Sequence, residues 1–392
     1  MIAQNMYRLL NGRFEQIGMS WLKHSFCAVS EPTCGSCVGT PCSSLGVGCA
    51  DTYWAGLNGQ QGSLGPRSQI NPQGQGSGGT HTDPHPFPTG PNNIRGRLQI
   101  MDTDILAGGR NFAEIHYVTH DEPLTNRYNN ASWREVNLNL TSIIGVQPGQ
   151  ASVHFQEAAI FAWPAIDPTA IVGKVNVPGE GRFHLGSKVT DLGNGTWDYE
   201  YAVENVNSDR AAGSFSVPIP AGVTVINTGF HDISYHSGDG IGGVNYDGTD
   251  WPASQSGGQL IWTTDAFSIN QNANAIRWGT LYNFRFVANV GPDPAQQNVT
   301  IGLFKPGTPS VVQGRAFVPS VPVGCATVVH GDMNADALVN GADIDRFTQI
   351  LVNGGASTNE VCAGDLDGSA DGLITMTDLP AFVSCLLAGG CP

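Results

Sequence analysis

The side chains best suited to chemistry lie in about the last 60 residues, where oxygen-bearing residues recur at short intervals. Calcium takes about six to eight hard oxygen ligands, which a loop of about 12 residues supplies from positions 1, 3, 5, 7, 9 and 12. The stretch from Asp332 to Asp343 has an oxygen atom for each position. The predicted ligands are Asp332, Asn334, Asp336, the Leu338 carbonyl, Asn340 (directly or through water) and Asp343.

A second acidic loop follows 35 residues later. In the same register its predicted ligands are Asp367, Ser369, Asp371, the Leu373 carbonyl, Thr375 and Asp378. Gly372 takes position 6, where the sharp turn favours glycine. The hydroxyls at positions 3 and 9 are weaker ligands, so we expect this loop to bind calcium less tightly. A register starting at Asp365 would put Met376 at position 12, which needs a carboxylate, and is disfavoured.

Apolar residues at helical spacing follow each loop and predict two loop–helix units. They are Ile344, Phe347, Ile350 and Leu351 after the first loop, and Leu379, Phe382 and Leu386 after the second. Val339, beside the carbonyl ligand of the first loop, is expected to pack that loop against its twin.

The two units resemble a type I dockerin, the duplicated calcium loop–helix module of secreted bacterial polysaccharide-degrading systems. The resemblance covers 330–388 and rests on Asp-x-Asn-x-Asp-x-x-Val-Asn-x-x-Asp and Asp-x-x-x-Asp-Gly-x-Ile-Thr-x-x-Asp. It implies a small helical module that calcium orders and that docks onto a cohesin-type protein domain.

Nine cysteines form two groups near the two ends of the chain. They are Cys27, Cys34, Cys37, Cys42 and Cys49 in the first group, and Cys325, Cys362, Cys385 and Cys391 in the second. Clusters in loop-like sequence favour disulfides formed in an oxidising compartment. The Cys34-Gly-Ser-Cys37 spacing also suits half a zinc site or a redox motif. Disulfides indicate a protein that is extracellular or on the cell surface.

Export requires a signal segment, and none is recognisable after Met1, because Arg8, Arg13 and Glu15 interrupt the apolar start. We therefore expect that a signal peptide upstream of Met1 is missing from this version of the chain. The net charge of −15 disfavours binding to nucleic acid, whose phosphates would repel the protein. No run of about 18 apolar residues predicts a membrane span.

Short alternating runs between Gly, Pro and Asn clusters predict a mainly β body. We expect residues 1–93 to hold N-terminal strands, with a turn at Asn11-Gly12, and a Cys-rich, Gly/Pro-rich loop region. A β-rich region in 94–180 and a β-sandwich in 181–307 follow. A Pro-rich linker in 308–324 then leads to the calcium module in 325–392. Region 94–180, including a strand predicted at 152–163, belongs either to the same sandwich or to a second β domain. The predicted fold class is an immunoglobulin-like, Greek-key β-sandwich followed by a small α-helical dockerin-like module.

Asp198, Glu200 and Glu204 share one face of a predicted strand, since side chains alternate with period two. Paired carboxylates of this kind serve as acid and nucleophile in glycoside hydrolases. The alternative is a solvated face opposite a core face that carries Tyr199 and Tyr201.

Two other residue types have chemical alternatives. His116, His120 and His154 could hold zinc or copper, although ten histidines produce such spacing by chance. Trp251, Trp262 and Trp278 could offer platforms for sugar rings, although tryptophan in a sandwich is more often core.

These patterns together predict an exported modular protein that binds calcium and attaches its β body to a protein partner or a cell-surface component. One alternative is a carbohydrate-active enzyme, acting on polysaccharide, that the module carries. Another is a structural component of the cell envelope or of an appendage.

Overall fold

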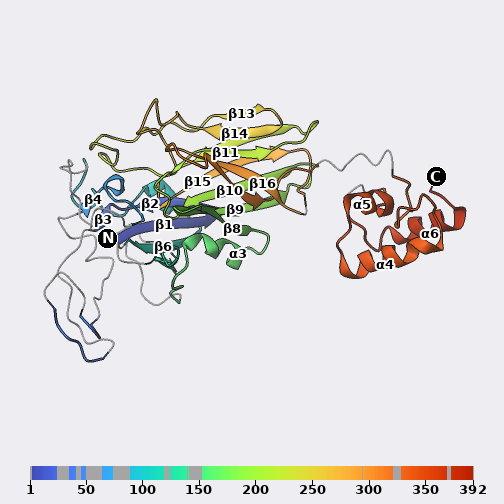
Figure 1. Cartoon of the computed structure of the whole chain (residues 1–392), viewed down its shortest axis with the longest axis horizontal. Helices are drawn as coiled ribbons and strands as arrows, with labels where there is room; N and C mark the ends of the chain where they lie inside the picture. The colour runs from blue at the N-terminus through green and yellow to red at the C-terminus, as the bar shows by residue number, and fades with distance from the viewer. Residues whose placement is uncertain are drawn as a thin grey trace. The chain divides into compact units, whose positions relative to one another are not determined.

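Three antiparallel sheets and a separate group of helices make up the computed structural model (Figure 1). The structure describes residues 2–23, 35–40, 46–49, 64–73, 89–118, 123, 125–138, 140, 152–293, 295–320, 328–368 and 372–391. The chain divides into two compact units, 1–319 and 320–392, which we call the body and the C-terminal unit. The prediction of a mainly β chain with a β-sandwich body and a small helical C-terminal part is confirmed.

The N-terminal sheet is built on the predicted hairpin at the start of the chain. Asn11 and Gly12 both have positive φ, +52° and +80°, as the tight turn between its two strands requires. The strands of this sheet are β1 (Ile2–Leu10), β2 (Arg13–Met19), β3 (Leu22–Lys23), β4 (Leu64–Gly65), β5 (Gln99–Ile100), β6 (Arg110–Tyr117) and β7 (Ala131–Val136). β1 pairs with β2 on one side and with β6, about 100 residues away in the sequence, on the other.

Two five-stranded sheets form the sandwich. The middle sheet has the order β12 (Val225–His231), β15 (Thr280–Ala288), β10 (Trp197–Asn205), β9 (Gly181–Asp191) and β8 (Ile171–Val177). The outer sheet has the order β13 (Ala253–Ser256), β14 (Gln259–Thr263), β11 (Ala212–Pro218), β16 (Gln297–Leu303) and β17 (Val311–Ala316). β17 falls inside the segment predicted as a Pro-rich linker; alternate residues of this strand are buried, so this part of 308–324 belongs to the sandwich.

The core between the middle and outer sheets is aromatic. Tyr199 and Tyr201 of β10 belong to it, and Tyr201 packs against Phe215 of the outer sheet, which in turn stacks on Trp262. Trp251 and Trp262 are 2% and 0% exposed and belong to this core, so neither offers a surface platform for a sugar ring. The predicted core face of β10 is therefore correct.

The N-terminal sheet covers the opposite face of the middle sheet, which makes the body three layers thick (Figure 1). Tyr7 and Phe14 of the N-terminal sheet share a buried cluster with Ala202 of β10 and Leu281 of β15. Short helices fill the edges of the body: η1 (Arg67–Gln69), α2 (Asp102–Leu106), η2 (Ala159–Phe161) and α3 (Ala162–Ile166). The strand predicted at 152–163 is wrong: it contains η2 and the start of α3, whose apolar residues pack into the same buried cluster.

The C-terminal unit consists of η4 (Gly341–Asp343), α4 (Ile344–Asn353), α5 (Thr358–Gly364) and α6 (Leu379–Ala388). Its small core contains Met333, Phe347, Ile350, Ala363 and Phe382.

Disulfides join Cys37 to Cys49 in the body and Cys385 to Cys391 in the C-terminal unit. No helix among the described residues is long and apolar enough to cross a membrane.

Candidate metal centre

The first acidic loop closes around the carboxylate of Asp343, which is fully buried at the start of α4. Its Oδ1 accepts hydrogen bonds from the backbone N–H groups of Met333 (2.8 Å) and Asn334 (3.2 Å). Its Oδ2 accepts from the Asn340 N–H (2.9 Å). One side chain therefore ties the beginning and the end of the loop together.

The other predicted ligands of this loop also turn toward its backbone. Asp332 Oδ1 accepts from the Asp336 N–H (3.1 Å), and Asp332 Oδ2 accepts from the Ala337 N–H (2.8 Å). The Asn334 and Asp336 side chains accept from backbone N–H groups two residues further on, and that of Asn340 caps η4. Leu338 is 62% exposed. Its side chain has no oxygen atom, so its backbone carbonyl is the one ligand that it can offer. The hydrogen bonds thus fold the first loop and its predicted side-chain ligands into one turn, but among the described residues only the second loop brings three metal-ligating oxygens within 4.8 Å of one another.

The second loop repeats the hydrogen-bond pattern around Asp378, which is 1% exposed at the start of α6. Asp378 Oδ1 accepts from the N–H groups of Leu366 (2.7 Å) and Asp367 (3.0 Å). Asp378 Oδ2 accepts from the Thr375 N–H (2.8 Å). Asp378 is therefore the structural equivalent of Asp343.

The same pattern makes Asp365 the equivalent of Asp332. Asp365 Oδ2 accepts from the Gly372 N–H (2.9 Å), as Asp332 Oδ2 accepts from the Ala337 N–H. The second loop then runs from Asp365 to Asp378, two residues longer than the first. This differs from the 12-residue register starting at Asp367, because Asp367 now corresponds to Asn334 at position 3.

The sequence disfavoured a register starting at Asp365, because a fixed loop length placed Met376 at position 12. A usable signal was present: Gly331-Asp332-Met333-Asn334 is repeated as Gly364-Asp365-Leu366-Asp367. The two extra residues lie after this repeat. Two other predicted ligands of this loop, Ser369 and Asp371, lie outside the described residues.

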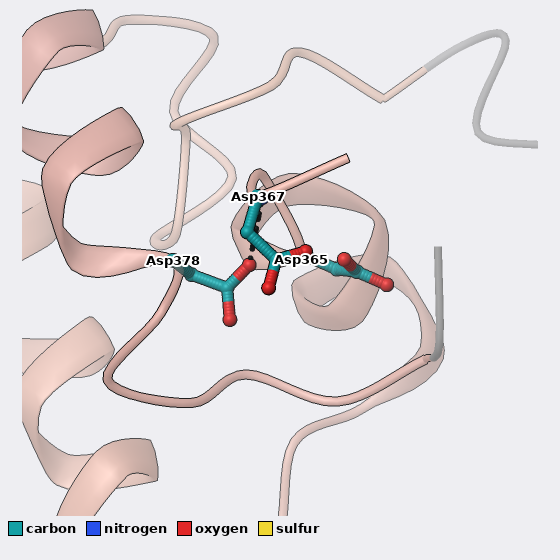
Figure 2. Close-up of side chains that lie close together, drawn as sticks. All are labelled: Asp365, Asp367 and Asp378. Carbon is teal, nitrogen blue, oxygen red and sulfur yellow. Dashed lines mark hydrogen bonds between the residues drawn. The ribbon is translucent and has the colours of Figure 1, made fainter. Parts of the chain in front are cut away.

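Three carboxyl groups meet at the second loop (Figure 2). Asp365, Asp367 and Asp378 each offer an oxygen, and these oxygens lie within 4.8 Å of one another. The Leu373 carbonyl and Thr375 belong to the same loop, and the Thr375 hydroxyl donates to Asp378 Oδ2 (3.2 Å). A donor set made only of oxygen atoms suits a hard divalent cation such as calcium.

The negative charge of the C-terminal unit also favours binding of a cation. Residues 320–392 hold eight Asp and one Glu against a single Arg and no Lys, a formal charge of −8. That one guanidinium, Arg346, pairs with Glu360 outside the loops (Nε–Oε1 2.5 Å), and this contact lowers the pKa of Glu360 to about 2. The loops therefore concentrate negative charge that the Lys and Arg residues of this unit do not balance.

In the body, Asp198, Glu200 and Glu204 share one face of β10 as predicted, but the N-terminal sheet covers that face. Glu200 is 6% exposed and forms an ion pair with Arg13 of β2. Glu204 is 3% exposed; its carboxyl group contacts Tyr7 Oη (3.1 Å) and His184 Nδ1 (2.8 Å). Burial raises the pKa of Asp198 and of Glu200, and raises that of Glu204 to about 7. The alternative of a solvated face is therefore wrong, and both Glu residues are engaged in contacts between layers.

The predicted histidines do not come together in the part of the chain that the structure describes. His116 is buried in β6 against Trp278, and burial lowers its pKa to about 3. His154 stacks on Trp133 with ring centroids 3.8 Å apart. His120 lies outside the described residues. No triad of metal-ligating side chains among the described residues includes a histidine.

A small cavity of about 30 Å³ lies beside η1 in the body. Its lining includes Arg67, Asp239, Tyr246, Arg277 and Trp278. A buried water needs roughly 10–15 Å³ of such space. This cavity therefore has room for about two waters and is too small for a sugar ring.

No protein-family model matches the chain, and no curated protein matches it. The functional proposal accordingly rests on the residues and their geometry.

Proposed function

We propose that the protein is an exported, modular β protein whose C-terminal unit binds two calcium ions and attaches the body to a protein partner or a cell surface. The single observation that carries this proposal is the duplicated hydrogen-bond pattern around Asp343 and Asp378. Two loops of different length reproduce the same closure, and both supply only oxygen ligands.

Paired apolar residues on the surface of the C-terminal unit support an attachment role. The loop equivalence matches Leu338 with Leu373, which are 62% and 58% exposed. It also matches Val352 of α4 with Leu387 of α6, which are 80% and 86% exposed. Exposed apolar side chains repeated in both halves suit contact with a protein surface, and the resemblance to a dockerin names a cohesin-type domain as the partner to test.

The disulfides Cys37–Cys49 and Cys385–Cys391 support export, since such bonds persist mainly in oxidising compartments. The glycoside hydrolase alternative receives no support from Glu200 and Glu204, because both side chains are buried in contacts with the N-terminal sheet.

Calorimetric titration of calcium into chelator-treated full-length protein tests the proposal. We expect two sites, and loss of one in the Asp332→Ala/Asp343→Ala variant. Asp345→Asn is the matched control, because Asp345 is an exposed carboxylate on α4 outside both loops. No measurable calcium binding by the folded wild-type chain would refute the proposal.

A further inference from the structure

The contact between the N-terminal and middle sheets contains a chain of three oxygen-bearing side chains. Tyr7 of β1 lies between Glu114 of β6 and Glu204 of β10. Its hydroxyl oxygen is 3.3 Å from Glu114 Oε1 and 3.1 Å from Glu204 Oε1. The three residues are 0%, 2% and 3% exposed, so bulk water does not solvate these oxygens.

Counting hydrogens shows that this arrangement needs a further proton. A tyrosine hydroxyl has one hydrogen and can donate to only one of the two carboxyl groups. If both carboxyl groups were ionised, the second contact would join two oxygens with no hydrogen between them. Two buried negative charges would also face each other across Tyr7, which is very costly in a low dielectric. One proton on a carboxyl group turns both contacts into hydrogen bonds.

The surrounding donors indicate which carboxyl group is the anion. Glu114 accepts from Asn5 Nδ2 (2.9 Å) and from the Ala159 N–H (2.8 Å). The Asn5 carbonyl oxygen in turn accepts from the Arg67 guanidinium (2.8 Å), so a positive charge lies at this end. In the described part of the chain, the Glu204 carboxyl group contacts only His184 Nδ1 (2.8 Å) besides Tyr7. Glu114 is therefore the better solvated carboxylate, and Glu204 is the carboxyl group that holds the proton.

We infer that Tyr7, Glu114 and Glu204 form a buried proton-binding site that joins the N-terminal sheet to the sandwich. The Glu204 carboxyl donates to the Tyr7 oxygen, and the Tyr7 hydroxyl donates to Glu114. Release of the proton leaves two adjacent carboxylates between the layers and weakens their contact.

The charged and titratable groups around the site fit this assignment. They are Arg67 from η1, His116 from β6 and His184 from β9, with Arg182 and Lys174 acting on His184. Burial lowers the pKa of His184 to about 3, so this ring is neutral and places no positive charge beside Glu204. Burial raises the pKa of both Glu114 and Glu204 to about 7, and the Glu204 carboxylate further disfavours ionisation of Glu114.

A carbon NMR titration of the full-length chain, isotope-labelled only in the glutamate carboxyl groups, tests the inference. We expect one glutamate to keep its proton until about pH 7, whereas an ordinary glutamate loses its proton near pH 4.5. Burial also raises the pKa of Asp239 to about 7. Labelling glutamate alone keeps the signal of this aspartate out of the spectrum. If no glutamate of the folded wild type titrated above about 4.5, the inference would be overturned, and this measurement needs no variant to fold.

Two variants assign the signal. Glu204→Gln places an amide donor where the protonated acid stood, so the late-titrating signal should vanish while the near-UV circular dichroism stays unchanged. Glu200→Gln is the control on the same face of β10, because Glu200 is paired with Arg13 and needs no shared proton. A late signal that survives in Glu204→Gln, or that disappears in Glu200→Gln, would contradict the assignment.

Discussion

Phe347 of α4 and Phe382 of α6 stack face to face in the C-terminal unit, with ring centroids 3.9 Å apart and planes within 5° of parallel. Each ring lies four residues after the carboxylate that closes its loop, Asp343 or Asp378. The helices that follow the two loops are therefore in direct aromatic contact in the core, so changes at one loop are expected to reach the other.

Removal of that contact should loosen the whole C-terminal unit. Phe382→Ala is expected to lower the free energy of unfolding of this unit by about 3–5 kcal/mol, because it deletes a buried aromatic ring. Denaturant titration of the calcium-loaded protein, followed by far-UV circular dichroism, measures the change. Leu387→Ala on the same helix is the control: that side chain is 86% exposed, and its loss should cost at most about 0.5 kcal/mol.

The loop equivalence predicts that Asp365 is a ligand. Asp365→Ala should abolish or strongly weaken calcium binding at the second loop and leave the first loop intact, because Asp365 occupies the place that Asp332 has in the first loop. Calorimetric titration against Asp345→Asn measures this. Unchanged two-site binding in Asp365→Ala would instead favour the register that begins at Asp367.

Chelation of calcium should unfold the C-terminal unit and spare the body, since all the proposed ligands lie in residues 332–378. All eight tryptophans lie in the body. Helical circular dichroism should therefore fall on addition of a chelator while tryptophan fluorescence stays constant, and added calcium should restore the signal. A parallel change in fluorescence would show that the metal stabilises the body as well.

Acid should destabilise the body through its buried histidines. Burial lowers the pKa of His116 from 6.5 to about 3, so the unfolded chain binds a proton that the folded chain excludes. Above pH 6.5, His116 is neutral in both states and does not change the free energy of unfolding. As the pH falls from 6.5 toward 3, this free energy decreases by about 1.4 kcal/mol per pH unit. His116→Gln should reduce the slope of unfolding free energy against pH by that amount.

His154→Gln is the matched control for that slope, since the His154 side chain is 45% exposed. Glu114 and Glu204 have raised pKa values and act in the opposite direction between pH 4.5 and about 7. The difference between wild type and each variant isolates the histidine contribution from theirs. Equal slopes in the wild type and His116→Gln would exclude a role for His116.

Local patterns made much of this fold predictable. The Asn11-Gly12 turn, the alternation along β10 and the apolar spacing of α4 each depend on residues close together in the sequence. What covers the acidic face of β10 was not predictable, because Asp198, Glu200 and Glu204 look like a solvated edge by themselves. Their partners Arg13 and Tyr7 lie almost 200 residues earlier.

The metal centre shows the same limit at shorter range. The first loop follows the expected spacing throughout, so its side-chain ligands could be predicted individually. The second loop contains two additional residues, and a template of fixed length cannot detect an insertion when serine and threonine oxygens also fill its positions. The hydrogen bonds to Asp365 and Asp378 show which positions correspond, and they agree with the short repeat that begins at Gly331 and Gly364.

The order of the layers has a consequence for how the chain matures. β1 and β2 come first in the sequence, yet they lie on strands β10 and β15, which are synthesised almost 200 residues or more later. Until those strands exist, Tyr7 and Phe14 lack one part of the surface on which they pack, and pairings between distant segments form slowly. We therefore expect the amino-terminal hairpin to be the last part to dock during biogenesis, and the segment most in need of a chaperone before then.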